Sequence, residues 1–345
     1  MKRLFTIDLK DYKENYRHFV RPSARGIIIN DEGKIALVYS VRDKYFKFPG
    51  GGIHEDEDKI TALVREVSEE VGLEVISESV REYGSVLRLQ NSIALENTLL
   101  EQENYYYFCD VTGKINSQNL DPYEAEAGFE LRVVSFEEAI DTNGVFESDD
   151  LFDSIMVERE RRVLEMIYAS LHPKNHICTK NLILRPVRMG DAKDIHAYAG
   201  DKNIDMMMFL PNETFEETKE FTKYSVSEWN KEKPKDREYV VLYEGKIIGG
   251  VNLELIEDTD TYEIGWIIHP DYRKKGFAFE AAEALIKYAF ETLNVSKIQA
   301  HCDSRNIASE KLMKKLGMKA IDKSGTRFYQ KTGITSGEYL YAVQK

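Results

Sequence analysis

The chain has 345 residues, 42% of them hydrophobic and 31% charged, with a formal net charge of −13 at pH 7. This length fits two domains of about 150–200 residues each, and the composition excludes a chain that is mainly disordered. The strong acidity argues against general nucleic-acid binding, and the lack of any run of about 18 apolar residues argues against a membrane-spanning helix.

The start of the chain does not have the pattern of a secretory signal. The apolar run that begins at Leu4 is four residues long and contains Thr6, whereas a secretory signal needs about 7–15 apolar residues. The three cysteines lie too far apart for a CxxC motif: Cys109, Cys178 and Cys302. We therefore expect a cytoplasmic protein with reduced thiols and no membrane association.

The first half of the chain predicts strands and helices around a glycine-rich turn at residues 50–52. Residues 60–71 carry apolar side chains at positions 60, 63, 64, 67 and 71. This is the stripe of an amphipathic helix, and Gly72 follows as its stop. The predicted elements are a β-hairpin of 25–30 with 35–40, the helix 60–71, strands 105–111 and 131–135, and a charged helix 150–171.

Three carboxylates gather on one face of the predicted helix. Glu66, Glu69 and Glu70 stand at i, i+3 and i+4, so they are neighbours on its surface. Residues 1–172 carry a net charge of −14, so a polyanionic substrate would need cations between it and the protein. Oxygen-only ligands suit Mg²⁺ or Mn²⁺. Arg65 is next to Glu66 in sequence and could hold that carboxylate in place.

The spacing around this helix resembles the signature of the Nudix hydrolase family, G-x5-E-x7-R-E-U-x-E-E-x-G-U, in which U is aliphatic. Every fixed position is matched between Gly51 and Leu73. The resemblance covers roughly residues 20–165. It implies an α/β/α sandwich that hydrolyses, with Mg²⁺, a nucleoside diphosphate linked to some other group X. The implied site residues are Glu66, Glu69 and Glu70 as metal ligands, Glu69 and Arg65 as catalytic residues, and Glu57 as a support of the loop.

Many members of this family add a metal-binding carboxylate from a loop before a late strand. Glu124 or Glu126 could fill that place here, and we take Glu126 as the candidate metal ligand. The alternative for either residue is a solvated loop glutamate. The aromatic residues of this half would either stack on a base or belong to the core: Tyr45, Phe46, Tyr105, Tyr106 and Tyr107.

Residues 173–177 read as a polar, proline-containing linker between a first domain of 1–172 and a second of 178–345. The elements predicted after it are strand 182–186, a mainly helical stretch to about 231, a hairpin of 239–243 with 247–256, strand 262–268, helix 276–292, strand 297–302, helix 308–316 and strand 338–343. Both halves mix strands and helices, so the fold class is predicted to be α/β or α+β in two domains.

A basic turn joins the strand 262–268 to the next helix. Arg273, Lys274 and Lys275 lead into Gly276. A helix N-terminus offers unpaired N–H groups and the positive end of the helix dipole, so this turn predicts a binding site for a pyrophosphate. Some 30 residues later, Asn306-Ile-Ala-Ser309 opens another helix, in which both polar side chains could also act as caps.

With these parts in this order, the second half resembles the GNAT acetyltransferases, and most of all their ribosomal-protein N-acetyltransferase branch. That branch shares an opening like Leu182-Ile-Leu-Arg-Pro-Val and a close like Asn306-x-x-Ser309 with Lys315-Leu-Gly. The resemblance covers roughly residues 178–343 and implies a mixed-sheet acyltransferase fold that uses acetyl-coenzyme A. The implied cofactor-binding residues are Trp266 and Ile268 along the pantetheine, Arg273, Lys274, Lys275, Gly276, Phe277 and Ala278 on the pyrophosphate, and Asn306 on the pantetheine arm.

In this family the acceptor amine attacks the thioester directly after losing a proton to a carboxylate or a water. No cysteine nucleophile is required, so Cys302 is expected in the core. Glu263 is the candidate base, and Ser309 is the group that would protonate or steady the leaving thiolate. Many members carry a tyrosine as general acid seven residues after the asparagine. That position here is Met313, which favours Ser309 or water as the acid.

Together the two halves predict a bifunctional enzyme. One half would hydrolyse a nucleoside diphosphate derivative, and the other would acetylate an amine of a small molecule or of a protein N-terminus. A first alternative is an acetyltransferase regulated by a Nudix domain that senses a nucleotide without hydrolysing it, and the intact carboxylates count against it. A second is a Nudix hydrolase with an inactive GNAT module, and the retained Asn306 and residues 273–278 count against that one.

Overall fold

The computed structural model describes residues 1–173, 176–201, 212–257 and 259–345. The chain divides into two compact units, Met1–Glu165 and Met166–Lys345. The boundary falls within α4 (Leu151–Leu171), a 21-residue helix. None of the described helices is both long and apolar enough to cross a membrane. The three cysteines are unpaired, and Cys109 and Cys302 are buried whereas Cys178 is exposed.

The first unit is built on an eight-stranded mixed sheet in which the central order is β1-β7-β8-β3-β4-β10, with β2 added to β8 and β5 to β4. A separate two-stranded sheet joins β6 to β9. The strands are β1 (Arg3–Asp8), β2 (Arg17–Val20), β3 (Ser23–Ile29), β4 (Ile35–Ser40), β5 (Phe46–Lys47), β6 (Leu73–Val75), β7 (Arg81–Asn91), β8 (Thr98–Phe108), β9 (Val111–Ile115) and β10 (Phe129–Val134).

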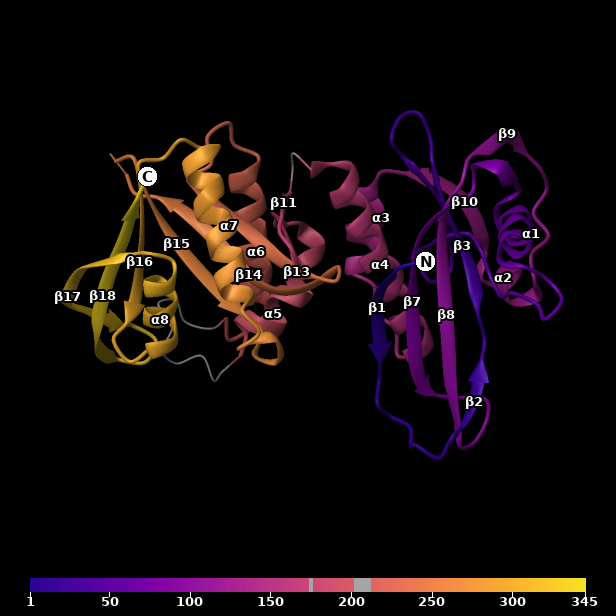
Figure 1. The fold of residues 1–345 in the computed structure, drawn as a ribbon, viewed down its shortest axis with the longest axis horizontal. Helices are drawn as coiled ribbons and strands as arrows, with labels where there is room; N and C mark the ends of the chain where they lie inside the picture. Colours follow the sequence, from indigo (N-terminus) through magenta and orange to yellow (C-terminus); the bar gives the residue numbers. More distant parts are fainter. Residues whose placement is uncertain (174–175, 202–211, 258) are drawn as a thin grey trace. The chain divides into compact units, whose positions relative to one another are not determined.

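Helices cover both faces of this sheet, so the first unit has the three layers of an α/β/α sandwich (Figure 1). On one side lies α1 (Lys59–Val71), and on the other lie α3 (Phe136–Gly144) and α4, while α2 (Pro122–Ala127) precedes β10. The apolar stripe of α1 packs into the core through Leu63, Val67 and Val71. Its opposite face is therefore free to carry carboxylates.

The predicted hairpin and both predicted helices of this unit are confirmed, as β3 with β4, α1 and α4. Five strands and two helices were not predicted: β1, β2, β5, β6, β7, α2 and α3. The strand expected at 105–111 is two strands, because β8 ends at Phe108 and β9 begins at Val111. β2, β5, β6 and α2 are each too short to show a periodic pattern.

The second unit has one eight-stranded sheet in the order β11-β12-β13-β14-β15-β16-β18-β17. All neighbours are antiparallel except β15 and β16, which are parallel. The strands are β11 (Ile177–Cys178), β12 (Leu182–Pro186), β13 (Asp236–Tyr243), β14 (Lys246–Leu255), β15 (Thr261–Ile268), β16 (Lys297–Asp303), β17 (Lys319–Tyr329) and β18 (Ile334–Gln344).

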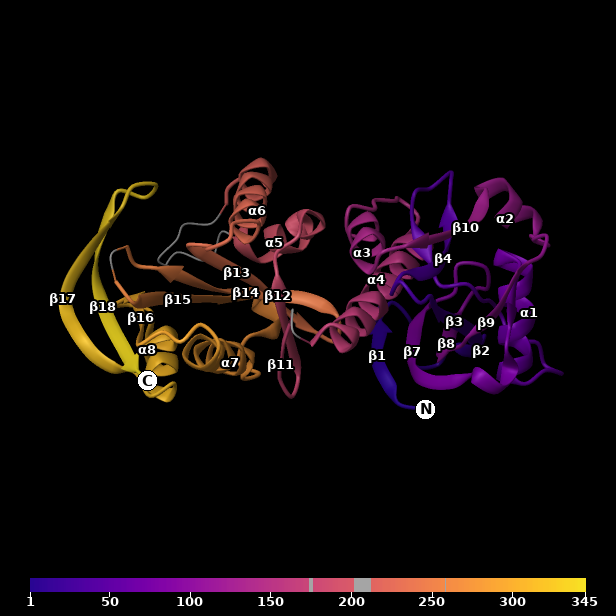
Figure 2. The same cartoon turned by 90° about the horizontal axis from the view of Figure 1, so that it is seen from above.

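In Figure 2, α5 (Ala192–Ala199) and α6 (Phe215–Trp229) lie on one face of this sheet, and α7 (Phe277–Glu291) and α8 (Ile307–Lys315) on the other. The larger apolar core lies under α7 and α8, and a smaller one lies under α5. The predicted strands and helices of this half are confirmed where the structure describes them, whereas residues 202–211 of the predicted helical stretch lie outside the described residues. β11 and β17 were not predicted. Most residues of β17 are exposed, so it shows little alternation of apolar and polar residues.

The central feature of this sheet is a gap between its two parallel strands. β15 and β16 pair only from Thr261 to Glu263 on one strand and from Lys297 to Gln299 on the other. β15 continues to Ile268 without β16 beside it. The backbone groups on that edge are therefore left for another partner.

Candidate active sites

The first candidate site lies on α1, whose ends are both fixed by local hydrogen bonds. The side chain of Asp58 caps the start by accepting from the backbone N–H groups of Ile60 and Thr61 at 2.8 and 3.1 Å. Gly72 ends the helix in the left-handed conformation with φ of 70°. The helix therefore holds its carboxylates in a defined register.

Arg65 connects the acidic residues of this site. Its Nη1 donates to Glu66 Oε1 at 2.8 Å and to Glu69 Oε2 at 3.0 Å. Its Nη2 donates to Glu57 Oε1 at 2.6 Å and to the carbonyl of Gly52 at 3.0 Å. This hydrogen bonding lowers the pKa of Glu57. Arg65 thus holds two helix carboxylates, Glu57 and the glycine turn in one network.

Glu70 holds the glycine turn through a hydrogen bond to its backbone. It is 2% exposed and accepts from Lys47 Nζ at 2.6 Å and from the backbone N–H of Gly50 at 2.7 Å. A Cβ on Gly51 would lie 2.1 Å from Glu66 Oε2. Only glycine at this position leaves room for the Glu66 carboxylate, so the turn and the helix face are matched.

The structure brings Glu124, and not Glu126, beside these carboxylates. Glu124 lies on α2, whose start it stabilises by accepting from the N–H of Asp121 at 3.0 Å. Burial and the neighbouring Glu70 raise the pKa of Glu124 to about 7. Glu126 is mostly exposed and lies 3.4 Å from Arg42. Of the two residues that the sequence left open, Glu124 is therefore the one near the helix carboxylates.

The donor set of this site fits Mg²⁺ or Mn²⁺ in its chemistry. It offers carboxylate oxygens on Glu66, Glu69, Glu70 and Glu124, with no sulfur or imidazole among them. Burial raises the pKa of Glu66, and nearby Glu70 adds to that effect. Within the described residues, no three His, Cys, Asp or Glu side chains are already arranged around one point. The carboxylates are instead linked by Arg65 and Lys47.

An open cavity of ≈ 600 Å³ lies at the start of α1, next to this network. Glu57, Tyr105 and Tyr107 are part of its lining. Lys59 Nζ lies 3.6 Å from the centre of the Tyr105 ring. The other aromatic candidates, Tyr45, Phe46 and Tyr106, are buried in the core. Tyr107 is itself 4% exposed and belongs to the core, so Tyr105 is the aromatic candidate most open to this cavity.

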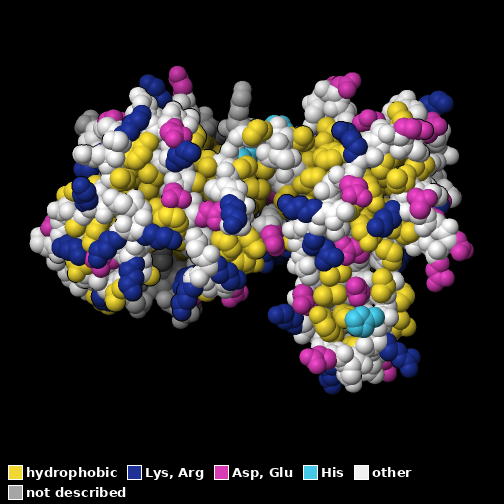
Figure 3. Space-filling view, in the orientation of Figure 1, with side chains coloured by type: hydrophobic (Ala, Val, Ile, Leu, Met, Phe, Trp, Pro, Cys, Tyr) yellow, Lys and Arg dark blue, Asp and Glu magenta, His cyan; other side chains and the backbone are white. Residues whose placement is uncertain are grey.

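The second candidate site follows the gap between β15 and β16. A groove of ≈ 640 Å³ runs from Trp266 and Ile268 along β15 to the start of α7. Gly276 precedes α7 with φ of 89°, and Lys274 also has a positive φ, of 62°. These two left-handed residues turn the loop sharply enough to expose the first N–H groups of α7. Figure 3 shows Lys and Arg side chains gathered around α8 and β17 in this unit.

Eight of the nine residues predicted to bind the cofactor line this groove, together with Ser309: Trp266, Ile268, Arg273, Lys274, Gly276, Phe277, Ala278 and Asn306. The ninth, Lys275, instead has its Nζ 5.0 Å from the ring centre of Tyr272. Asn306 caps α8 by accepting from the N–H of Ser309 at 3.0 Å. The groove thus unites the basic turn with the start of α8, which lie about 30 residues apart in the chain.

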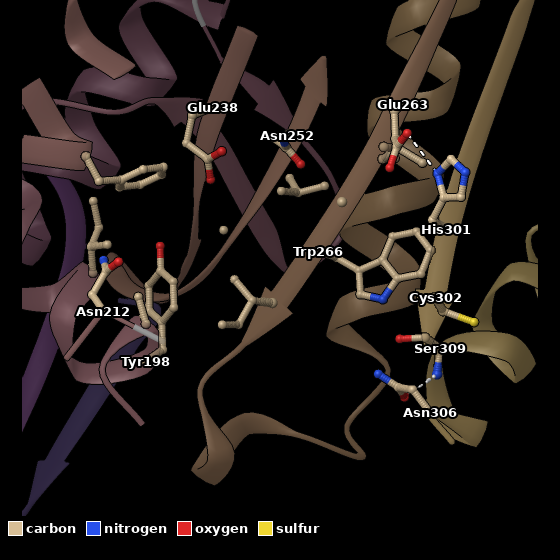
Figure 4. A pocket seen from close by; sticks show the side chains of 18 residues that line it. Tyr198, Asn212, Glu238, Asn252, Glu263, Trp266, His301, Cys302, Asn306 and Ser309 are labelled. Atoms are coloured by element: carbon tan, nitrogen blue, oxygen red, sulfur yellow. Dashed lines mark hydrogen bonds and ion pairs between the residues drawn. The ribbon is translucent and has the colours of Figure 1, made fainter. Parts of the chain in front are cut away.

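A second cavity, of ≈ 260 Å³, meets this groove at Trp266, Asn306 and Ser309. Its other end is lined by Tyr198, Asn212 and Glu238, as Figure 4 shows. Burial and the nearby Asp236 raise the pKa of Glu238 to about 8. The cavity therefore extends from the groove across the α5 and α6 face of the sheet.

Glu263 and His301 meet inside this cavity. His301 Nδ1 lies 2.9 Å from Glu263 Oε2, and this interaction raises the pKa of His301. Cys302 also lines the cavity, but burial raises the pKa of its thiol to about 11, so the thiol stays protonated at neutral pH. Met313 is fully buried in the core and offers no proton to the site.

Comparison with known proteins finds both domains. Residues 181–319 match the Acetyltransferase (GNAT) domain model, and residues 20–154 match the NUDIX domain model. The uncharacterized N-acetyltransferase YnaD of Bacillus subtilis is 34% identical over 173 residues, which are 49% of this chain and 96% of that protein. The chain belongs to the GNAT acetyltransferases. It carries a NUDIX domain in front of its GNAT domain.

Two further proteins each match one part of the chain. The RNA pyrophosphohydrolase of Pseudomonas putida F1 is 43% identical over 54 residues, so the chain spans about a third of that protein (34%). A solved GNAT-family acetyltransferase from Bacillus anthracis is 27% identical, with a TM-score of 0.43, and covers 49% of this chain and 98% of that one.

Sequence reasoning did not find several residues that line the cavity of ≈ 260 Å³: Tyr198, Asn212, Glu238, Asn252 and His301. Strand register brings two of them, Glu238 and Asn252, to the same face as Glu263. Glu238 pairs with Asn252, which pairs with Gly265 two residues from Glu263. Alternation along β13 and β14 was the available signal, but it does not tell which strands are neighbours.

Proposed function

We propose that the NUDIX domain hydrolyses a nucleoside diphosphate linked to another group, with a divalent cation, and that the GNAT domain transfers acetyl from acetyl-coenzyme A to an amine. We place the domains at 1–172 and 178–345, joined by a linker of 173–177. The unpaired thiols support a reducing compartment, and we propose the cytoplasm.

In the NUDIX domain, Glu66, Glu69, Glu70 and Glu124 are the residues that would hold Mg²⁺ or Mn²⁺. Such a cation would polarise the phosphorus–oxygen bonds and lower the pKa of an attacking water. Arg65 orients Glu66 and Glu69 through its Nη1. Glu160 accepts from the N–H of Phe48 at 2.9 Å and so positions the strand that leads into the glycine turn. The matched carboxylate network is the observation that supports hydrolysis.

In the GNAT domain, the groove supports binding of acetyl-coenzyme A. The pyrophosphate would accept from N–H groups at the start of α7, and the pantetheine would lie along the unpaired edge of β15 after Glu263. The thioester would then lie where the groove meets the cavity of ≈ 260 Å³, which we take as the acceptor-side cavity. The meeting of these two cavities at Trp266 and Ser309 is the observation that carries the proposal.

The transfer step then uses groups of this chain at both ends. The amine nitrogen loses a proton to the Glu263 carboxylate, forms its bond to the thioester carbon, and the carbon–sulfur bond breaks. The leaving thiolate accepts a hydrogen bond from the Ser309 hydroxyl and takes its proton from a water, while the proton on Glu263 passes back to solvent. His301, beside Glu263, holds that carboxylate at the point where β15 and β16 separate.

The test is phosphate-product release with Mg²⁺ from a panel of nucleoside diphosphate sugars, dinucleotides and coenzyme A, with Glu69→Gln beside the wild type. Coenzyme A release from acetyl-coenzyme A with a panel of amines tests the other domain. Hydrolysis that is lost in Glu69→Gln supports the first activity. Binding without hydrolysis across the panel would instead favour a NUDIX domain that senses a nucleotide.

A further inference from the structure

The acceptor-side cavity has two acidic ends. Glu263 lies where β15 and β16 separate, and Glu238 lies on β13 at the far end (Figure 4). Among the described residues of its lining, none is Lys or Arg, and the one basic side chain is His301, which already faces Glu263. The second carboxyl group therefore has no cation of the protein beside it in this lining.

Two glycines create the room around Glu238. A Cβ on Gly250 would lie 2.9 Å from Glu238 Oε1 and 3.0 Å from the hydroxyl of Tyr198. A Cβ on Gly265 would lie 2.5 Å from Asn252 Oδ1. Any larger residue at either position would displace these polar atoms. The floor of the cavity is thus shaped to present three oxygen-bearing side chains, from Glu238, Tyr198 and Asn252, to the same space.

The register of the strands sets the separation of the two carboxyl groups. Glu238 is opposite Asn252, Asn252 is opposite Gly265, and Glu263 is two residues from Gly265 on the same strand. β13 and β15 are two strand spacings apart across the sheet, and Glu263 lies two residues along β15 from Gly265. These two perpendicular steps give roughly 12 Å between the Cα atoms of Glu238 and Glu263. Both side chains leave the same face of the sheet. Side chains of one type that stand parallel off the sheet keep this separation at their carboxyl groups, so hydrogen bonds of about 2.9 Å at each end leave roughly 6 Å between the two partner nitrogens of an acceptor.

We propose that the acceptor of the GNAT domain is a small diamine, acetylated on the nitrogen at Glu263 and held by its other ammonium group at Glu238. This inference rests on the proposed acetyl-coenzyme A-dependent activity. It names Glu238 as the specificity residue, with Tyr198 and Asn252 as further hydrogen-bond partners. The cavity of ≈ 260 Å³ is the size of a small molecule and not of a folded peptide segment.

The balance of charge supports a cation at Glu238. A buried carboxyl group is stabilised when an ammonium group reaches it, because the pair is compensated in a medium of low polarity. A monoamine of the same length would leave Glu238 against an apolar end. An anionic acceptor would meet two carboxyl groups and would be repelled.

The experiment compares α,ω-diamines of about four to six methylenes with monoamines of equal length, in wild type, Glu238→Gln and Glu257→Gln. Glu257 gives the matched control: it has the same charge, is 79% exposed and pairs with Lys235 outside the cavity. We expect wild type and Glu257→Gln to prefer the diamine about 10- to 100-fold in kcat/KM. Glu238→Gln is expected to lose this preference through a lower kcat/KM for the diamine.

Acetyl-coenzyme A binding, measured by calorimetry for every protein, separates the possible failures. The proposal is overturned if the wild type has equal kcat/KM for diamines and monoamines. It is also overturned if the preference for diamines survives in Glu238→Gln. Binding of acetyl-coenzyme A with no acetylation of any amine also overturns it, while cofactor use stands. No binding of acetyl-coenzyme A contradicts the proposed function itself, and the diamine inference falls with it.

Discussion

His301 Nδ1 lies 2.9 Å from Glu263 Oε2, across the point where the two parallel strands of the GNAT sheet separate. The two residues stand on different strands and meet only because β15 and β16 stop pairing after Glu263 and Gln299. The gap that would take the thioester therefore also places a carboxylate and an imidazole beside it. The imidazole is turned toward the carboxylate and fixes its position.

Glu263→Gln is expected to lower the kcat of acetyl transfer by about 10²–10³-fold, because the amine then lacks its proton acceptor. The change keeps the size of the side chain and leaves the groove for acetyl-coenzyme A untouched. We therefore expect the Kd for acetyl-coenzyme A to stay within about 3-fold of the wild type. Initial-rate assays of coenzyme A release measure kcat. Glu257→Gln is the control. A variant with wild-type kcat would show that water or another group takes the proton.

Glu124→Gln and Glu126→Gln form a matched pair on one short helix. Glu124 lies beside Glu70, whereas Glu126 is exposed and pairs with Arg42. We expect Glu124→Gln to reduce metal-dependent hydrolysis by about 10²-fold or more, since a ligand oxygen loses its charge. Glu126→Gln should retain hydrolysis within about 2-fold. The Mg²⁺ dependence of product release measures both, and the opposite ranking would assign the ligand to Glu126.

The parts of both sites that are contiguous in the chain could be predicted from the sequence. Arg65, Glu66, Glu69 and Glu70 follow from helical spacing, and residues 273–278 follow from a basic turn before a helix. In each case the local geometry of a single element brings the side chains together. Local spacing is sufficient for such sites.

The residues that the sequence did not reveal depend on which strands become neighbours. Glu238 and His301 are separated by more than 60 residues and come together through three strand pairings and a gap. Likewise, only the short helix α2 decides between Glu124 and Glu126, because it turns one inward and the other outward. Its six residues are too few for a periodic signal.

Glu238→Gln is expected to stabilise the second unit at alkaline pH while it impairs acceptor binding. Burial and Asp236 raise the folded pKa of Glu238 to about 8, above its ordinary value of 4.5. Between these pH values the folded state binds more protons than the unfolded state, so stability falls as pH rises from 4.5 toward 8. Glutamine does not ionise, so the variant avoids the fall in stability that ionisation of Glu238 causes. Thermal unfolding at pH 5 and pH 8.5 should show a Tm gain for the variant at pH 8.5 that is smaller or absent at pH 5.

The buried Asp303 joins the end of β16 to the β17–β18 hairpin, and we expect its replacement to unfold the second unit first. It is 1% exposed and accepts from Arg305 Nη2 at 2.8 Å, from the hydroxyl of Tyr329 at 3.1 Å and from Ser336 Oγ at 3.0 Å. Burial alone would raise its pKa, but these donors hold it at about 2. Asp303→Asn leaves several donors with a poorer acceptor and should cost about 2–4 kcal/mol.

Urea unfolding followed by tryptophan fluorescence measures this loss in the second unit, because the two tryptophans of the chain, Trp229 and Trp266, both lie there. The exposed Asp322→Asn is the control, since its carboxylate bonds only locally to Ser324. The contribution of Asp303 is present above its ordinary pKa of 3.8 and is lost as pH falls toward 2. The difference between wild type and Asp303→Asn should therefore be full at pH 7 and shrink below pH 3.8. Equal urea midpoints for the two variants at pH 7 would contradict this role.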